Sequence, residues 1–122
     1  MNREPGFWEA IERIRAADDR LKPAAYPFMM ETLDFTMRTL GERRHVTARE
    51  LLDGLCGYAR HRFGLLAGTV LENWGISSGR DVGRAVFQLV NAQILSRRES
   101  DRLEDFDIDY DLTTRLEDKY LE

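Results

Sequence analysis

Residues 80–95 read RDVGRAVFQLVNAQIL, and their apolar side chains recur at helical spacing. They fall on two adjacent stripes, one with Val82, Val86 and Leu89 and the other with Gly83, Phe87, Val90 and Ile94. Two such stripes make an apolar face wide enough to pack against more than one neighbouring helix. Arg84, Gln88 and Asn91 form a narrow polar stripe on the remaining side. We therefore expect residues 80–95 to be the central helix of a mainly α-helical domain.

The residues before this helix predict a helix-turn-helix. A short helix is expected over residues 65–74, with Leu66, Val70, Leu71 and Trp74 facing inward. The connection Gly75-Ile76-Ser77-Ser78 is tight, and Ile76 is its expected buried pivot. Ser78 followed by Asp81 three positions later resembles a weak capping box for the central helix.

Three further helices are predicted upstream. Amphipathic spacing indicates helices over residues 7–20 and 27–40, the second ended by Gly41. The third begins at Thr47-Ala48-Arg49-Glu50, a capping box in which Thr47 and Glu50 bind each other's amides. Val46 and Leu51 are placed as its hydrophobic staple, and Gly64 is expected to end the helix.

After residue 95 the pattern changes to a strict period of two. Phe106, Ile108, Tyr110 and Leu112 alternate with Asp105, Asp107, Asp109 and Asp111, which predicts a strand with one buried face. Residues 94–97 are the expected partner strand, and Thr113 or Thr114 is expected to cap a last helix. The predicted fold is mainly α, a single domain over residues 1–122 that includes the acidic segment 99–122. It has five to six helices, a helix-turn-helix and a small C-terminal β-hairpin, and is winged-helix-like.

Composition indicates an ordinary globular chain. Residues 1–98 hold 15 basic and 12 acidic residues, whereas residues 99–122 hold three basic and 10 acidic ones. This weakly basic body does not by itself indicate nucleic-acid binding. A single cysteine, Cys56, excludes an internal disulfide and suits a reducing compartment. The sequence has no apolar run of bilayer length and no apolar secretion core at its start, so we expect a cytoplasmic protein without membrane association.

One candidate recognition face lies on and after the central helix. Arginine, glutamine and asparagine are the side chains that read base edges in a DNA major groove. The face comprises Arg80, Arg84, Gln88 and Asn91, with Arg97 and Arg98 placed in the wing to hold phosphates. Asp81 and the acidic segment oppose DNA binding, because phosphate repels carboxylates. A solvated face on a core helix is the alternative interpretation.

A second candidate surface is the acidic edge formed by Asp105, Asp107, Asp109 and Asp111. It lacks the glycine of a calcium-binding EF-hand loop, so we interpret it as a solvated face or a docking edge. Cys56, His45 and His61 do not have zinc-ligand spacing or the pattern of a Cys–His nucleophile pair. Gly75, Gly79 and Gly83 match no phosphate-binding motif, and we expect Gly83 to permit close packing. No catalytic residue, metal or cofactor is predicted.

Several short motifs together resemble a known family. They include Ala25-Tyr26, Arg44-His45-Val46-Thr47, Trp74-Gly75-Ile76, Asp81-Val82-Gly83 and Val86-Phe87-Gln88-Leu89-Val90, and the similarity covers nearly the whole chain. The chain resembles a small uncharacterised bacterial family restricted to planctomycetes, verrucomicrobia and their relatives. The resemblance implies a bacterial, cytosolic protein and no activity, cofactor or catalytic residue.

The leading functional hypothesis is a non-enzymatic module that binds another protein or itself. Aromatic residues near the termini, where a small domain has least cover, favour it: Phe7, Trp8, Tyr110 and Tyr120. The alternative is a DNA-binding regulator that uses the helix at residues 80–95. An enzyme would require a concave site that gathers His61, Glu72 or Asp81.

Overall fold

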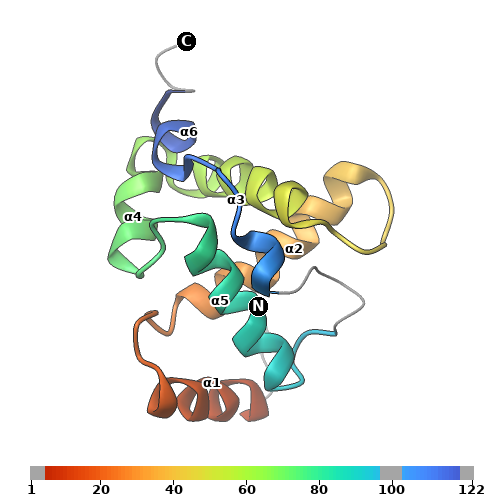
Figure 1. The fold of residues 1–122 in the computed structure, drawn as a ribbon, viewed down its shortest axis with the longest axis vertical. Coiled ribbons are helices and arrows are strands. Elements are labelled where there is room, and N and C mark those ends of the chain that lie inside the picture. Colours follow the sequence, from red (N-terminus) through yellow and green to blue (C-terminus); the bar gives the residue numbers. More distant parts are fainter. Residues whose placement is uncertain (1–4, 97–102, 119–122) are drawn as a thin grey trace.

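The computed structural model describes residues 5–96 and 103–118, with side chains described for residues 6–96 and 105–116. Within these ranges the chain forms six α-helices and two short 3₁₀ helices, and no β-strand (Figure 1). The elements are α1 (Pro5–Ala17), α2 (Ala25–Leu40), α3 (Ala48–Phe63), η1 (Gly64–Leu66), α4 (Ala67–Asn73), α5 (Gly79–Asn91), η2 (Leu103–Phe106) and α6 (Leu112–Asp118). The predicted mainly α-helical class is confirmed.

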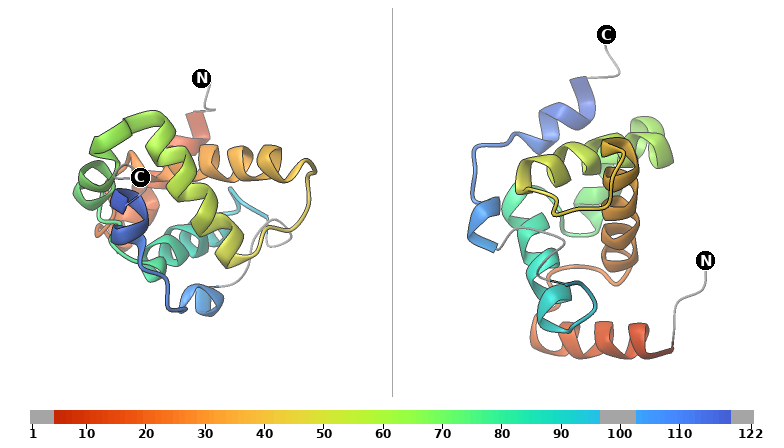
Figure 2. Two further views of the ribbon diagram at one scale, coloured as in Figure 1. Left: turned by 90° about the horizontal axis from the view of Figure 1, so that it is seen from above. Right: turned by 90° about the vertical axis from the view of Figure 1, so that its right-hand side faces the viewer.

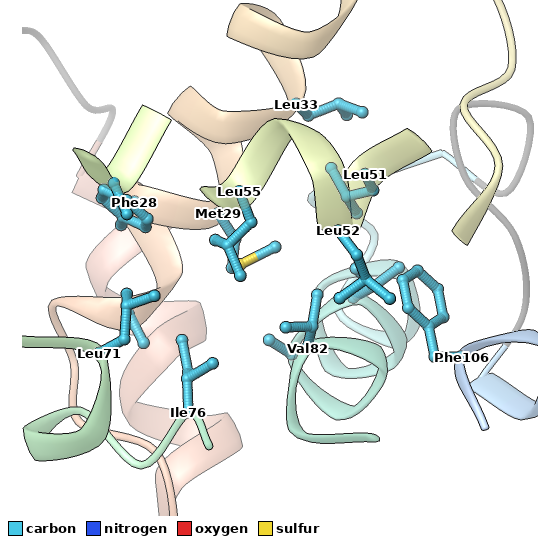
Figure 3. Packing of buried hydrophobic residues seen from close by; sticks show 14 of the residues in the cluster. Phe28, Met29, Leu33, Leu51, Leu52, Leu55, Leu71, Ile76, Val82 and Phe106 are labelled. Atoms are coloured by element: carbon cyan, nitrogen blue, oxygen red, sulfur yellow. The ribbon is translucent and has the colours of Figure 1, made fainter. Parts of the chain in front are cut away.

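Helix α5 lies between α1 and the pair formed by α2 and α3. Figure 2 shows from a second direction that α1 and α6 lie at opposite ends of the molecule. Side chains from α2, α3, α4, α5 and η2 meet in one core (Figure 3). Leu52, Leu55 and Leu71 are fully buried there, and Val82 joins α5 to the same cluster. The central position of α5 predicted from its two apolar stripes is confirmed.

The start of α3 is the capping box that the sequence predicts. The amide of Glu50 donates to Thr47 Oγ1 at 3.2 Å, and the amide of Thr47 donates to Glu50 Oε1 at 3.0 Å. The Arg44 guanidinium adds a hydrogen bond of 2.9 Å to Glu50 Oε2. Val46 and Leu51, the expected staple residues, are both buried. The helix ends at Phe63, followed by Gly64 with a φ of 56°.

The turn between α4 and α5 is also as expected. Gly75 has a φ of 94°, which favours glycine, and Ile76 is buried beneath the turn. The amide of Asp81 donates to Ser78 Oγ at 3.4 Å, so Ser78 caps α5. In a true capping box the Asp81 carboxylate would accept from the amide of Ser78. Here Asp81 Oδ2 accepts instead from the amide of Ser77, at 2.9 Å.

Two glycines of α5 allow η2 to lie directly against its backbone. A Cβ atom at Gly83 would lie 2.6 Å from Phe106 Cβ and 2.9 Å from its Cγ, and one at Gly79 would lie 3.1 Å from the Phe106 carbonyl oxygen. Phe106 is fully buried at this contact, with its ring near Leu52 and Val82 (Figure 3). Close packing at Gly83 is therefore confirmed, and the partner is the 3₁₀ helix η2.

The predicted β-hairpin is wrong, and with it the wing. Residues 105–112 form the end of η2, an irregular segment and the start of α6, without strand pairing. The expected partner residues cap α5, because the amides of Ile94 and Leu95 both donate to the Leu89 carbonyl, at 2.9 and 3.1 Å. Those amides are no longer available for a ladder with another strand. Arg97 and residues 98–102 lie outside the described residues.

Several smaller expectations also need correction. Helix α5 ends at Asn91, well before residue 95, and α2 starts at Ala25, two residues before Pro27. Leu66 was expected to face inward but is 63% exposed, because the chain bends at Gly64 into η1. Asp111, and neither of the two threonines, caps α6, since its carboxylate accepts from the amide and hydroxyl of Thr114 at 3.1 and 2.6 Å.

The contact at Gly83 predicts that Gly83→Ala lowers the free energy of unfolding by up to about 2 kcal/mol. Overpacking costs about 1–3 kcal/mol, and the better helix propensity of alanine offsets only about 1 kcal/mol. Gly68→Ala in α4 is the matched control, because no atom lies within 4 Å of its added Cβ. It should leave stability unchanged or raise it by up to about 1 kcal/mol. Urea unfolding of the two variants tests this, and equal stability would contradict the contact.

The α3 cap predicts a pH dependence. Hydrogen bonds from the Arg44 side chain and the Thr47 amide lower the pKa of Glu50 to about 2. Since the folded-state pKa is below the ordinary value of 4.5, the ionised cap stabilises the fold above pH 4.5. This contribution is lost as the pH falls toward 2. The free energy of unfolding of Glu50→Gln should therefore depend less steeply on pH between about 2 and 4.5 than that of the unaltered chain. Denaturation at a series of pH values measures this, and parallel profiles for the two proteins would contradict the role of the cap.

Candidate functional site

A groove of about 720 Å³ lies between α1 and α5. Its volume lies within the usual range of ligand sites. One set of its lining residues is charged: Arg13, Asp18, Arg20, Arg80 and Arg84. A second set is apolar and comprises Ala10, Ile14, Ala17, Phe87 and Ala92. The remaining lining residues are Gln88, Asn91 and Gln93, whose side chains are polar. The groove thus combines apolar surface with an excess of positive charge.

Helical spacing brings these side chains together. On α5, Arg80, Arg84 and Phe87 follow one another at intervals of four and three, and Asn91 continues the row. On α1, Ala10, Ile14 and Ala17 form the facing row. Phe87, expected in the core, is instead 48% exposed at the groove. The 3₁₀ helix η2 covers the glycine face of α5, and α1 lies opposite the arginine face across the groove.

A chain of hydrogen bonds holds the base of the groove. The buried Tyr26 hydroxyl donates to Gln88 Oε1 at 2.7 Å, and Gln88 Nε2 donates to Asp18 Oδ2 at 3.4 Å. Asp18 in turn accepts from Arg20 Nη2 at 2.6 Å and from its Nε at 2.9 Å. These contacts join α2, α5 and the connection that follows α1.

Hydrogen bonds and burial determine which groups of this network carry a proton. Hydrogen bonds from the Arg20 side chain and amide lower the pKa of Asp18 to about 2, so it stays ionised. Burial, with a smaller effect of the Asp18 charge, raises the pKa of Tyr26 to about 12, so its hydroxyl stays protonated. Around neutral pH, Tyr26 therefore remains a donor and Asp18 an acceptor.

The four arginines of the groove differ in how far they are neutralised. Arg20 pairs with Asp18, and Arg84 Nη1 lies 2.7 Å from Asp81 Oδ1. No ion pair joins Arg13 or Arg80 to any described residue. These two guanidinium groups leave the groove with uncompensated positive charge.

The predicted recognition face is partly brought together here. Arg80, Arg84, Gln88 and Asn91 all line the groove, whereas Arg97 and Arg98 lie outside the described residues. The face is concave, and Arg84 and Gln88 are occupied by bonds within the chain. The contribution of α1 was missed. Its row of Ala10, Ile14 and Ala17 was visible in the sequence, but local spacing does not say which helix it faces.

The predicted acidic edge does not form a strand edge. All four aspartates are exposed, and Asp111 is used as the cap of α6. Between them, Tyr110 is buried and donates to Asp53 Oδ1 at 2.6 Å. The guanidinium of Arg115 lies 4.5 Å from the Tyr110 ring centroid and bonds Asp53 at 3.2 Å. Tyr110 thereby fastens the irregular segment to α3.

The residues considered for catalysis or metal binding are not gathered into one site. Cys56 is buried, and burial raises the pKa of its thiol, as expected for a small apolar core residue. His61 is exposed near the end of α3, and Asp81 belongs to the cap of α5. Glu72 lines a separate hollow of about 90 Å³ between α4 and α6. Among the side chains that the structure describes, no cluster of potential metal ligands occurs.

No family model matches the sequence, and no curated protein or solved structure matches the chain. The resemblance to a planctomycete and verrucomicrobial family therefore stays a prediction. Over the part of the chain that the structure describes, no helix is long and apolar enough to span a bilayer.

The hydrogen bond between Tyr26 and Gln88 predicts a measurable coupling. Tyr26→Phe and Gln88→Ala should each lower the free energy of unfolding, the first by about 1 kcal/mol. Because each substitution removes the same bond, the double variant should lose less than the sum of the two. Chemical denaturation of the four proteins measures this difference. Strict additivity would show that the bond contributes nothing.

Proposed function

We propose that the protein is a binding module whose α1–α5 groove accepts an acidic segment with an apolar side chain from a protein partner. The observation that carries this proposal is the pair Arg13 and Arg80 beside the exposed ring of Phe87. Guanidinium groups bind carboxylates with good geometry, and an exposed aromatic ring offers an anchor for an apolar side chain. A partner segment with both features would use both parts of the groove.

The aromatic residues near the termini give further, partial support. Trp8 is 43% exposed and packs edge-on against Phe7, with ring centroids 5.1 Å apart. Tyr110 is instead buried on α3, so it is not part of an open surface. Tyr120 lies outside the described residues. Of these aromatic residues near the termini, the exposed one is therefore Trp8 on α1, the helix that forms one wall of the groove.

DNA recognition by α5 receives less support from this geometry. A recognition helix must protrude to enter a major groove, whereas the polar face of α5 is one wall of a concavity shared with α1. Gln88 is bound to Tyr26 and Asp18, so reading a base edge would require these bonds to break. Exposed aspartates at positions 105, 107, 109 and 111 would repel phosphate.

The chemistry of the groove also favours binding over catalysis. Its lining side chains are arginines, amides, apolar groups and Asp18. A carboxylate whose pKa is about 2 is a weak general base at neutral pH. What the groove offers a partner is positive charge around an apolar centre.

Binding of short synthetic peptides tests the proposal. Peptides in which one isoleucine is flanked by aspartates should bind with a Kd of about 0.1 mM or tighter at low salt. Peptides with lysines in place of the aspartates should not bind. In nuclear magnetic resonance titrations, the acidic peptides should shift the amide signals of Phe87, Gln88 and Asn91.

Charge-reversed variants provide the control. Arg13→Glu with Arg80→Glu should weaken peptide binding about tenfold or more. Arg43→Glu should leave it unchanged, because Arg43 is an exposed arginine of the α2–α3 connection and does not line the groove. The proposal fails if acidic peptides leave the groove signals unmoved, or if Arg43→Glu weakens binding as much as the double variant.

A further inference from the structure

The segment 107–109 has the features of a ligand for this groove. Ile108 is 40% exposed and stands between Asp107 and Asp109, which are both exposed. No hydrogen bond or ion pair joins these three side chains to any described residue. The chain therefore presents an apolar side chain between two carboxylates that no described contact uses.

This segment is held away from the groove of its own chain. Phe106 before it is buried against Gly83, and Tyr110 after it is buried against α3. Two anchors only four residues apart leave Ile108 little reach, since an extended chain spans at most about 3.5 Å per residue. In Figures 1 and 2 the chain runs from η2 toward α6, away from α1. Contact between segment and groove therefore requires two molecules.

The two surfaces complement each other in charge and apolar character. The groove has two unneutralised guanidinium groups, on Arg13 and Arg80, near the exposed ring of Phe87. The segment has two carboxylates around one isoleucine. Both surfaces are already held in place, one by the Tyr26–Gln88–Asp18 bonds and the other by Phe106 and Tyr110. Little conformational entropy would be lost on binding.

We infer that the partner is a second copy of this chain, whose 107–109 segment occupies the α1–α5 groove. This inference rests on the proposed function. Ile108 of one copy lies against Phe87 of the other, and the aspartates lie beside Arg13 and Arg80. The contact joins two different surfaces of the chain. A closed dimer forms when each copy places its segment in the groove of the other, and a longer assembly forms when each copy binds a further one.

Sedimentation with charge-exchanged variants tests the inference on the full chain. The groove variant is Arg13→Glu with Arg80→Glu, and the segment variant is Asp107→Arg with Asp109→Arg. Each variant alone brings like charges together, so its self-association should be about tenfold weaker or more than that of the unaltered chain. A mixture of the two restores opposite charges and should recover association. Higher salt should weaken every complex.

Removing the apolar anchor is an independent check. Ile108→Ala should weaken association by about tenfold, because the substitution removes most of the apolar surface that Ile108 buries in the complex. Leu65→Ala with Leu66→Ala is the matched control, since these leucines are more exposed than Ile108 but belong to η1 and do not line the groove. Circular dichroism of all variants verifies that each one folds.

Three results would overturn the inference. They are a monomeric unaltered chain at roughly 1 mM and low salt, association that survives both charge reversals, and a mixture that does not recover. If the chain stays monomeric while acidic peptides still bind the groove, the proposed function stands and only the identity of the partner is wrong. If neither occurs, both proposals fail.

Discussion

The packing of Phe106 against bare helix backbone is the contact on which the rest of the arrangement depends. At Gly83 there is no room for a Cβ atom, so η2 lies directly on α5 and its phenylalanine reaches the core beside Leu52. This contact covers one face of α5, while Val82 and Leu89 bury a second face against α2 and α3. The arginine face is left open toward α1, and the groove forms there.

The polar contacts then fix what this open face presents. Bonds from Tyr26 to Gln88 and from Gln88 to Asp18 tie the end of α1 to α5 and α2. Ion pairs with Asp18 and Asp81 neutralise Arg20 and Arg84, whereas Arg13 and Arg80 have no ion pair with any described residue. At the other end of the molecule, Tyr110 holds the acidic segment against α3. The chain thus carries positive and negative surfaces that its own fold keeps apart.

The sequence predicted those features that depend on neighbouring residues. The Thr47–Glu50 cap, the buried Ile76 and the buried stripe of Val82, Val86 and Leu89 follow from local spacing and were confirmed, whereas Phe87 of the second predicted stripe is exposed. The strand over residues 105–112 was wrong because alternation describes which side chains are buried and does not show whether a partner strand exists. Phe106, Tyr110 and Leu112 are indeed buried, in helices and an irregular segment, but Ile108, expected on the same buried face, is 40% exposed. The groove was found only in part, since the placement of α1 opposite α5 is a long-range arrangement that local spacing does not show.

Nuclear Overhauser contacts between Phe106 and α5 test this account most directly. The packing predicts strong cross-peaks from the ring and Cβ protons of Phe106 to the Cα protons of Gly83. A β-hairpin would instead place the backbone of residues 105–112 beside residues 94–97 and give cross-strand contacts between their Cα protons. Finding the cross-strand set without the Phe106–Gly83 contacts would contradict the fold and the two separated surfaces derived from it.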